Sequence, residues 1–591
     1  MNTLKVTPFI LLLLAGVSIS CNDNDLENRL DLLTFEVNSV KLVNNILEFK
    51  YFLLDKKYSE ILISQISEDN STNKLRIDFE DGNSLEVDHG IVKNYILDAK
   101  NWEADFNFTD STSIQTFYLG NIPEISSSDI VLNPFKNAPL TAMIKYTTPV
   151  KGKFQVTVVG QDGIESDIVR SFDYYDYEHS LEIIGLYPGY SNEVTLKFMS
   201  KDGIKRFVKS IQIVTQQLPL GLPDFGIVKQ YEQVETNVLF LVNYRPTNIP
   251  FMVDAFGKIR WYSIGFSLTT KYGLQVFKNG NIGFGVSGNG QGSVYEYSML
   301  GELIKEYSVY PVFQNVHHDV FEMPNGNFLI TADKIGIPTV EDHIVEMDRT
   351  TGMITNVWDL REILPTDRYT LRKIGDGSDW FHINAVIYDD KDNSIVVSGQ
   401  AQGVVKLTWN NELKWILAPH DGWSSEYVPY LLSPIIQAEF DWTWGQHAPC
   451  LLPNGNLLIF DNGFGRGFGT ATSQYSRAVE YEITENQNNE GGTISQIWQY
   501  GKERGLEMFA PFISDVDYIE QSGTRLITAG SLEYNLTYTD NLNNSITPSP
   551  HRIETRIIEV NEAGIVLFEM TLSSLQHVGT TYRSEKIWLK K

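Results

Sequence analysis

A hairpin motif that recurs through the second half of this chain constrains its fold more than any other feature. In each copy, two strands of alternating apolar residues flank a turn. Four copies turn at Asn279-Gly280, Asn325-Gly326, Asn454-Gly455 and Ser522-Gly523, and a fifth copy, residues 382–397, has a longer turn. Asn-Gly favours tight hairpin turns, because both residues tolerate left-handed backbone conformations. The motif therefore predicts repeated antiparallel hairpins.

Six further hairpins alternate with these motifs. They begin at residues 250, 294, 344, 404, 478 and 557, and most end in a strand that carries tryptophan or another aromatic residue. Strands that repeat in this way are typical of a β-propeller with four-stranded blades. The pattern predicts an all-β fold with a six-bladed β-propeller over residues 221–591. The segment 579–589 has no hairpin partner of its own, so we expect it to pair with residues 237–244 and close the first blade.

The rest of the chain also has the pattern of short strands. Residues 22–128 break at Asn, Asp and Gly, and predict a small antiparallel N-terminal β module. Residues 129–220 predict an immunoglobulin-like β-sandwich, because strands of five to eight residues alternate there with Gly and Pro turns. Aromatic residues make up 12% of the 591 residues and charged residues only 20%, a composition that favours β-structure over disorder.

Residues 1–21 have the pattern of a lipoprotein-type signal. Lys5 precedes an apolar run from residue 8 to residue 17, and small residues follow up to Cys21. The run is too short to cross a bilayer as a helix. We expect cleavage before Cys21 and acylation of its sulfur, which would anchor the protein to a membrane. The alternative is a plain secretory signal that is cleaved nearby.

The net charge of −27 limits the partners of the protein. Such a surface repels nucleic acid and does not attract anionic substrates over long distances. We therefore expect no nucleic-acid partner, and an anionic substrate would need basic groups close to its binding site.

Histidines occupy equivalent positions in several inner hairpins. His318 and His447 each lie seven residues before the turn asparagine, Tyr272 and Asp515 have the same spacing, and His382 opens the unit with the longer turn. Inner strands line the channel of a propeller, so we expect these side chains to form a ring. A cluster of three histidines suits either a metal site or group transfer with a neutral imidazole as the nucleophile. Asn384, Tyr582 and Arg583 are expected beside the ring, whereas His317 is expected to point away from it.

The segments "NVHHDVFEMPNGNFLI", "DWFHINAVIYDDKDNSIVVSG", "WTWGQHAPCLLPNGNLLIFDNG", "YSRAVEYEI" and "TTYRSEKI" together resemble the bacterial arylsulfate sulfotransferases. The resemblance covers residues 130–591. It implies transfer of a sulfuryl group from a phenolic sulfate donor to a phenol acceptor, without a nucleotide sulfate donor and through a sulfohistidine intermediate. It puts the nucleophile at His447, and it implies that His318, His382 and Asn384 hold the sulfate oxygens and assist proton transfer. Tyr272 and Tyr582 would provide aromatic walls.

The remaining expectations concern cofactors, oligomeric state and location. No cofactor and no metal are expected, a homodimer is considered, and the protein is expected to be a periplasmic or cell-surface lipoprotein of a Gram-negative bacterium. One position departs from the pattern: the family usually has arginine as a sulfate clamp where this chain has Gln400. Either another cation, such as Arg583 or Arg466, replaces this charge, or the substrate differs. Two alternatives remain open, namely a metal-dependent enzyme with a tri-histidine site and a non-catalytic propeller lipoprotein that binds glycans or a partner.

Overall fold

The computed structural model of the protein consists almost entirely of β-strands, as the all-β prediction required. It describes residues 125–201, 206–245, 247–265, 271–288, 291–368, 376–436, 440–468, 474–488, 490–533, 553–573 and 579–589, together with the backbone of eight strands between residues 35 and 118. The expected signal segment and Cys21 lie outside the described residues. No helix in the described part of the chain is long and apolar enough to span a membrane.

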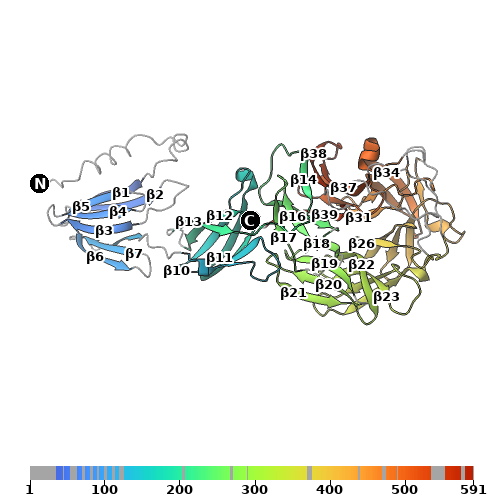
Figure 1. Cartoon of the computed structure of the whole chain (residues 1–591), viewed down its shortest axis with the longest axis horizontal. Helices are drawn as coiled ribbons and strands as arrows, with labels where there is room; N and C mark the ends of the chain where they lie inside the picture. Colours follow the sequence, from blue (N-terminus) through green and yellow to red (C-terminus); the bar gives the residue numbers. More distant parts are fainter. Residues whose placement is uncertain are drawn as a thin grey trace.

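The eight N-terminal strands form small antiparallel sheets, which lie at one end of the long axis in Figure 1. They are β1 (Phe35–Val43) with β2 (Ile46–Leu53); β3 (Ile63–Asp69), β4 (Lys74–Phe79) and β5 (Ser84–Asp88); and β6 (Val92–Asp98), β7 (Glu103–Phe108) and β8 (Ile114–Tyr118).

The next five strands form the immunoglobulin-like region. They are β9 (Ile130–Leu132), β10 (Thr141–Val158), β11 (Ile168–Ile184), β12 (Ser191–Ser200) and β13 (Arg206–Val214). The sheet order is β11-β10-β12-β13, with β9 paired to β10. Pairing between β10 and β11 is irregular between Thr147 and Gly152. The apolar side chains of this sheet, including Phe154 and Phe198, belong to a core that continues into the propeller.

The described residues from 224 to 588 form six sheets of four or five strands, which are the blades of the predicted propeller. Blade 1 contains β17 (Ile259–Tyr262), β16 (Phe251–Asp254), β15 (Val238–Tyr244) and β39 (Thr581–Trp588), and blade 2 contains β18 (Lys271–Val276), β19 (Ile282–Gly288), β20 (Gln291–Tyr297) and β21 (Leu303–Ser308). Blade 3 contains β22 (Phe313–Glu322), β23 (Phe328–Lys334), β24 (His343–Met347) and β25 (Ile354–Asp359), and blade 4 contains β26 (Ile383–Asp389), β27 (Ser394–Gly399), β28 (Gly403–Thr408) and β29 (Leu413–Leu417).

Blades 5 and 6 each gain an extra outer strand. Blade 5 contains β31 (His447–Leu451), β32 (Leu457–Asp461), β33 (Arg477–Glu485), β34 (Gly492–Tyr500) and the added β30 (Leu432–Pro434). Blade 6 contains β35 (Asp515–Ile519), β36 (Thr524–Glu533), β37 (Ile553–Val560), β38 (Val566–Ser573) and the added β14 (Asp224–Lys229). The 3₁₀ helices are η3 (Ser127–Asp129), η4 (Ile164–Ser166), η5 (Leu360–Glu362), η6 (Val428–Tyr430) and η8 (Lys502–Met508).

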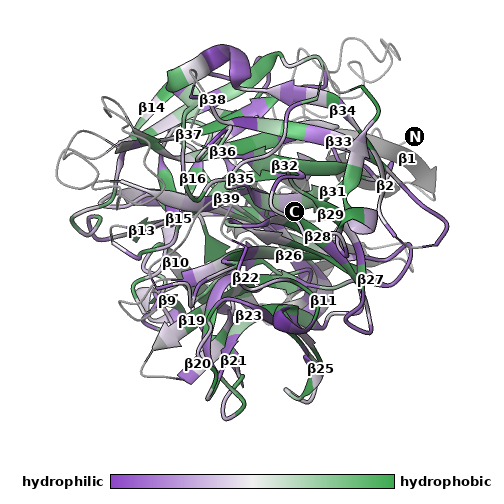
Figure 2. Ribbon diagram, turned by 90° about the vertical axis from the view of Figure 1, so that its right-hand side faces the viewer, coloured by the Kyte–Doolittle hydropathy of each residue, from purple (hydrophilic) through white to green (hydrophobic). Residues whose placement is uncertain are grey.

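The ring closes between the two ends of the propeller sequence. Strand β39 pairs with β15 in antiparallel register, from Val238 opposite Trp588 to Tyr244 opposite Thr581. The expected closure by residues 579–589 is therefore confirmed. In Figure 2, the inner strands β22, β26, β31, β35 and β39 gather around the centre of the ring. The pairing gives β15 a partner on its inner edge, which would otherwise present unpaired backbone groups.

The hairpin turns differ in detail from the expectation. In the turn of blade 5, the N–H of Gly455 donates to the carbonyl of Leu452 at 2.8 Å, and only the glycine is left-handed, with φ of 92°. This arrangement is a three-residue turn with a glycine bulge. The following Asn456 explains the recurring Asn-Gly-Asn sequence, because its amide donates to Glu480 on the third strand at 2.7 Å. Blades 2 and 3 have equivalent bonds from Asn281 to Glu296 and from Asn327 to Glu346.

A bulge near the start of the inner strands positions the site. In β22, Val316 pairs with Ala332 and Val320 with Ile330, so three residues face a single residue of the partner strand. Shorter bulges occur in β18, β26 and β31. A left-handed residue accompanies each bulge: Gly273, His318, His382 and Ala448. Bulges redirect side chains, and here they do so at one end of the channel.

Candidate active site

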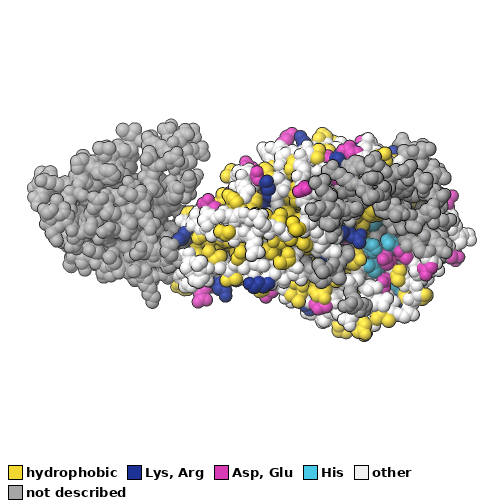
Figure 3. Space-filling model, in the orientation of Figure 1, with side chains coloured by type: hydrophobic (Ala, Val, Ile, Leu, Met, Phe, Trp, Pro, Cys, Tyr) yellow, Lys and Arg dark blue, Asp and Glu magenta, His cyan; other side chains and the backbone are white. Residues whose placement is uncertain are grey.

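The structure brings Tyr272 and the three histidines of the sequence-predicted ring together with Tyr582. The ring centroids of His318 and His382 are 4.9 Å apart, and Tyr272 lies 5.8 Å from His318. The ring of Tyr582 lies between those of His318 and His447, with centroid distances of 5.9 Å and 6.1 Å. Figure 3 shows histidine side chains with acidic ones beside them on this face of the propeller. The site is thus a small aromatic and imidazole cluster that reaches the protein surface.

His447 is held in one neutral tautomer. It is only 2% exposed, and its Nδ1 lies 2.8 Å from Oδ1 of Asn462 and 3.1 Å from the carbonyl of Gly445. The amide nitrogen of Asn462 donates to the carbonyls of Ala510 and Ile513, so its oxygen must face the imidazole. Both partners of Nδ1 are therefore acceptors, and Nδ1 carries the proton. Burial lowers the pKa of His447 to about 3, and the lone pair on Nε2 is available at neutral pH.

His318 is fixed through both ring nitrogens. Its Nδ1 lies 2.9 Å from the hydroxyl of Tyr582, and its Nε2 lies 3.1 Å from Oε2 of Glu341. The hydroxyl of Tyr582 also donates to the carbonyl of Asn384 at 3.3 Å. The side-chain amide of Asn384 donates to the carbonyl of Gln446 at 2.7 Å, while its Oδ1 has no hydrogen-bond partner among the described residues.

His382 lies between two carboxylates. Its Nδ1 is 2.6 Å from Oδ2 of Asp379 and 2.7 Å from Oε2 of Glu341. Burial lowers the pKa of His382, but the hydrogen bonds with Asp379 and Glu341 outweigh this effect and raise it to about 9. The Nδ1 proton is therefore directed at the carboxylates, and Nε2 is the nitrogen that remains for a substrate. A carboxylate that orients an imidazole in this way is a common arrangement in acid–base catalysis.

Glu341 is one functional residue that sequence reasoning missed. It lies in the connection between β23 and β24 and has a left-handed backbone, with φ of 56°. Its carboxylate contacts both His318 and His382, and it has an unusually low pKa because these two imidazoles outweigh the effect of burial. The available signal was weak, since a glutamate in a loop is ordinarily a solvated residue.

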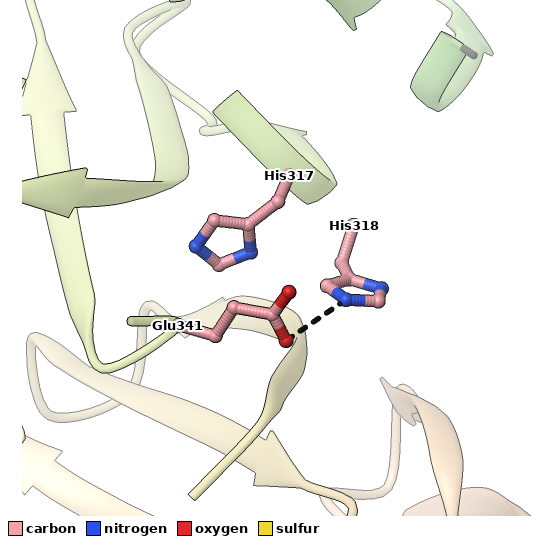
Figure 4. Close-up of side chains that lie close together, drawn as sticks. All are labelled: His317, His318 and Glu341. Carbon is pink, nitrogen blue, oxygen red and sulfur yellow. Dashed lines mark hydrogen bonds and ion pairs between the residues drawn. The ribbon is translucent and has the colours of Figure 1, made fainter. Parts of the chain in front are cut away.

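The expectation for His317 was wrong. Alternation along a regular strand would turn it away from the site, but the bulge in β22 brings both neighbouring imidazoles to the same side. Their ring centroids are 5.4 Å apart, and a nitrogen of each lies within 4.8 Å of a carboxylate oxygen of Glu341. Figure 4 shows the His317 ring facing this carboxylate.

The arginines considered as substitutes for the missing clamp are already paired. Arg583 binds Asp319 at 3.0 Å, and Arg466 binds Asp461 at 2.8 Å. Gln400 is buried next to the site, and its backbone N–H donates to the carbonyl of His382 at 3.0 Å. A different cation, Arg245, follows β15.

The positive charge of Arg245 influences the two tyrosines of the site. Burial raises the pKa values of both Tyr272 and Tyr582, and the positive charge of Arg245 partly offsets this effect at each. Its side chain is half-buried, and it was not recognised in the sequence because it directly follows a strand rather than a motif.

Two charged residues near His447 have structural roles. Asp461 accepts bonds from the guanidinium of Arg466 and from Nε of Arg477, and it also binds the N–H groups of Trp444 and Gly463. Arg477 is fully buried and donates to the carbonyl of Asp441. Because all these groups bind one another, they support the loop that precedes His447 rather than face a substrate.

Comparisons with known proteins show to which family the chain belongs. The profile of the arylsulfotransferase (ASST) family matches residues 226–583, and the profile of the arylsulfotransferase Ig-like domain matches residues 129–216. Arylsulfate sulfotransferase AssT of Escherichia coli O6:H1 is 26% identical over 514 residues, which cover 68% of this chain and 85% of that protein. The protein of the same name from Lelliottia amnigena is 26% identical over 519 residues, with the same coverage of both chains.

Two of the solved structures that match this chain show only weak similarity. Virginiamycin B lyase from Staphylococcus aureus is 11% identical, with a TM-score of 0.27 over 71% of this chain and 100% of that chain. A quinonprotein alcohol dehydrogenase-like protein from Bacteroides thetaiotaomicron is 11% identical, with a TM-score of 0.29 over 75% of this chain and 94% of that chain. Neither similarity bears on activity. The family profile, by contrast, covers more than half of the chain, from within β14 to the first residues of β39, and the chain belongs to the arylsulfotransferase family of enzymes.

Proposed function

We propose that this protein transfers a sulfuryl group from a phenolic sulfate ester to a phenol through a sulfohistidine at His447, without a nucleotide sulfate donor. The observation that carries the proposal is the tautomer of His447, whose Nδ1–H is held by Asn462 and Gly445. Its Nε2 lone pair is thereby available, and a neutral imidazole attacks an anionic ester without having to lose a proton first.

The reaction proceeds in two displacements at sulfur. In the first, Nε2 of His447 forms a bond to sulfur, the bond from sulfur to the phenolic oxygen breaks, and the leaving oxygen takes the electron pair. In the second, the oxygen of the acceptor phenol attacks sulfur, and the bond to Nε2 breaks. His382 gives a proton to the first phenol and takes one from the second, because its Nδ1 is oriented by Asp379 and its Nε2 remains available. Tyr272 and Tyr582 bind the aryl rings.

The first experiment measures release of 4-nitrophenol from 4-nitrophenyl sulfate in the presence of phenol and without nucleotide. Wild-type protein should release it, and His447→Ala should lose nearly all activity because no other group in this position offers a lone pair. His420→Ala is the matched control, since His420 bonds the carbonyl of Leu432 in β30, the outer strand of blade 5.

Intact-mass measurement without acceptor should show one added sulfuryl group that peptide mapping locates at His447. Equal release of nitrophenol by His447→Ala would exclude the sulfohistidine route. No release by the wild-type protein would leave non-catalytic binding as the function.

We also propose that acylated Cys21 anchors the protein in the cell envelope of a Gram-negative bacterium. The support is the sequence of residues 1–21, with an apolar run that ends in small residues before the cysteine. Labelling cells with a palmitate analogue should mark the wild-type protein and not Cys21→Ser. Label on both proteins would contradict the anchor.

A further inference from the structure

His317, His318 and Glu341 form a group that the proposed reaction does not fully explain. One potential ligand atom from each residue lies within 4.8 Å of the others. His317 and His318 reach this position together only because β22 carries its unusually long bulge, and Glu341 approaches from the connection between β23 and β24. Figure 4 shows both imidazoles directed toward the carboxylate.

His317 has no hydrogen-bond partner for either ring nitrogen among the described residues, although it is only 5% exposed. Its Nε2 lies 3.6 Å from Oδ1 of Asp333, which is too far for a hydrogen bond. A buried polar group without a partner costs about 1–3 kcal/mol, so an imidazole in this position indicates a ligand. The nitrogen that does not face Asp333 is the one available to bind it.

The charge distribution also indicates a cation. Oε2 of Glu341 contacts Nε2 of His318 and Nδ1 of His382, and Asp379 contacts the same Nδ1. Two carboxylates thus converge on one N–H group, which can donate only one proton. A site that must accept a sulfate monoester has additional negative charge to compensate, and Gln400 contributes none.

We infer that His317, His318 and Glu341 bind a divalent transition-metal ion, and that Zn²⁺ fits this set best. Two imidazoles with one glutamate are a common ligand set of catalytic zinc, with a further position left open. Mg²⁺ and Ca²⁺ are disfavoured because they require mainly oxygen ligands.

The neighbouring residues suit this ligand set. When Nε2 of His318 binds the ion, its Nδ1–H donates to the hydroxyl oxygen of Tyr582, which lies 2.9 Å away. Asp333 faces the other nitrogen of His317, and His382 donates to the ligating carboxylate. Such outer contacts orient the ligands of a metal and raise their basicity.

The role of the ion rests on the proposed function. Its open position would bind a non-bridging oxygen of the sulfate ester, so that the ion provides the positive charge that arginine would otherwise provide at Gln400. This departs from the sequence-based expectation of a metal-free site. It also explains why the carboxylate of Glu341 lies among the histidines, since it would be a ligand of the ion.

Metal binding is tested first without substrate. The full-length protein is treated with a chelator, dialysed and titrated with Zn²⁺. The bound metal is then measured by inductively coupled plasma mass spectrometry. About one ion per chain is expected for wild type, and less than about one tenth of that for His317→Gln and Glu341→Gln, because each removes one of three ligands. His420→Gln is the control and should retain the ion.

Co²⁺ provides a second readout that does not depend on stability. The visible absorption of Co²⁺ bound to nitrogen and oxygen ligands should appear in wild type and His420→Gln and be absent in both ligand variants. Circular dichroism shows whether each variant is folded. Equal metal content and equal absorption in folded wild type and ligand variants would overturn the site, as would failure of the wild type to bind either ion.

Activity measurements then test the role of the metal site separately from the proposed sulfuryl transfer. Chelation should lower the rate of 4-nitrophenol release at least tenfold, Zn²⁺ should restore it, and Gln400→Arg should make it less sensitive to the chelator. Full activity of the metal-free wild type would overturn the role of the ion while leaving sulfuryl transfer intact. Specific Zn²⁺ binding without any nitrophenol release would sustain the site and refute the reaction.

Discussion

His447 shows how the neighbours of a residue decide its chemistry. Asn462 has only one orientation that satisfies its own donors, since its amide nitrogen bonds two carbonyls. Its oxygen therefore faces His447 and selects the proton position. Burial lowers the pKa of His447, because it favours the uncharged imidazole. The reactive lone pair thus depends on an amide that takes no part in the reaction.

The buried imidazole of His447 should make stability depend on pH. Its folded pKa of about 3 lies below the ordinary value of about 6.5, so this contribution to stability is present above pH 6.5 and is lost as pH falls toward 3. Lowering the pH from 7 to 5 should cost about 2 kcal/mol through this group. The melting temperature of wild type should therefore fall more over this interval than that of His447→Asn. An equal fall in both proteins would contradict the assignment.

Arg245 should attract the anionic donor rather than the neutral acceptor. Its charge acts on Tyr272 and Tyr582, which line the site. We expect Arg245→Met to raise KM for 4-nitrophenyl sulfate by about threefold to tenfold and to change KM for phenol little. The factor corresponds to the loss of about 1 kcal/mol of partly screened attraction between the guanidinium and the sulfate. Steady-state kinetics with each substrate varied in turn measure both values. As a control, Arg361→Met removes a cation paired with Asp359 elsewhere.

At the scale of the element, one hairpin design serves several blades. A glycine bulge follows the first strand, and the asparagine after it anchors the turn to a glutamate on the third strand. The bulge at the other end of the strand presents the histidine. Stability and function therefore occupy opposite ends of the same strand, and the turn can be changed without altering the site.

Asn456→Ala tests this separation in the hairpin of His447. The variant loses the bond from Asn456 to Glu480 and leaves a buried carboxylate oxygen with one donor fewer. Unfolding free energy should fall by about 1–2 kcal/mol, seen as a lower melting temperature, while kcat and KM for 4-nitrophenyl sulfate stay the same. Asn488→Ala removes an exposed asparagine of the next turn and should cost little. Altered kinetics in Asn456→Ala would show that turn and site are coupled.

From residue 125 onward, the described part of the chain is held together by closure of the ring and by docking of the sandwich. Arg260 of blade 1 is fully buried and forms an ion pair with Asp254 at 3.1 Å. It also donates to the carbonyls of Gly185 and Ser166 and to the hydroxyl of Tyr187, all in the immunoglobulin-like region. One guanidinium therefore joins the propeller to the immunoglobulin-like region.

Replacing Arg260 with methionine should loosen this contact. The change leaves Asp254 as a buried, unpaired carboxylate and removes three bonds to the sandwich. We expect a loss of about 3–5 kcal/mol and faster proteolytic cleavage in the segment 216–223 between the two parts. Arg361→Met provides the comparison with a more exposed ion pair. Unchanged proteolysis in Arg260→Met would show that the apolar core alone holds the contact.

The sequence by itself determined the six blades, the closing strand and the presence of three histidines at the starts of inner strands. These properties follow from alternation and turn residues, which act over short distances along the chain. Tertiary structure alone decided that His317 joins the site, that Glu341 lies between two imidazoles, and that Arg583 and Arg466 are already paired. A bulge changes the direction of a side chain without a distinctive sequence, and the charge of a group is set by partners that only folding brings within a few ångströms.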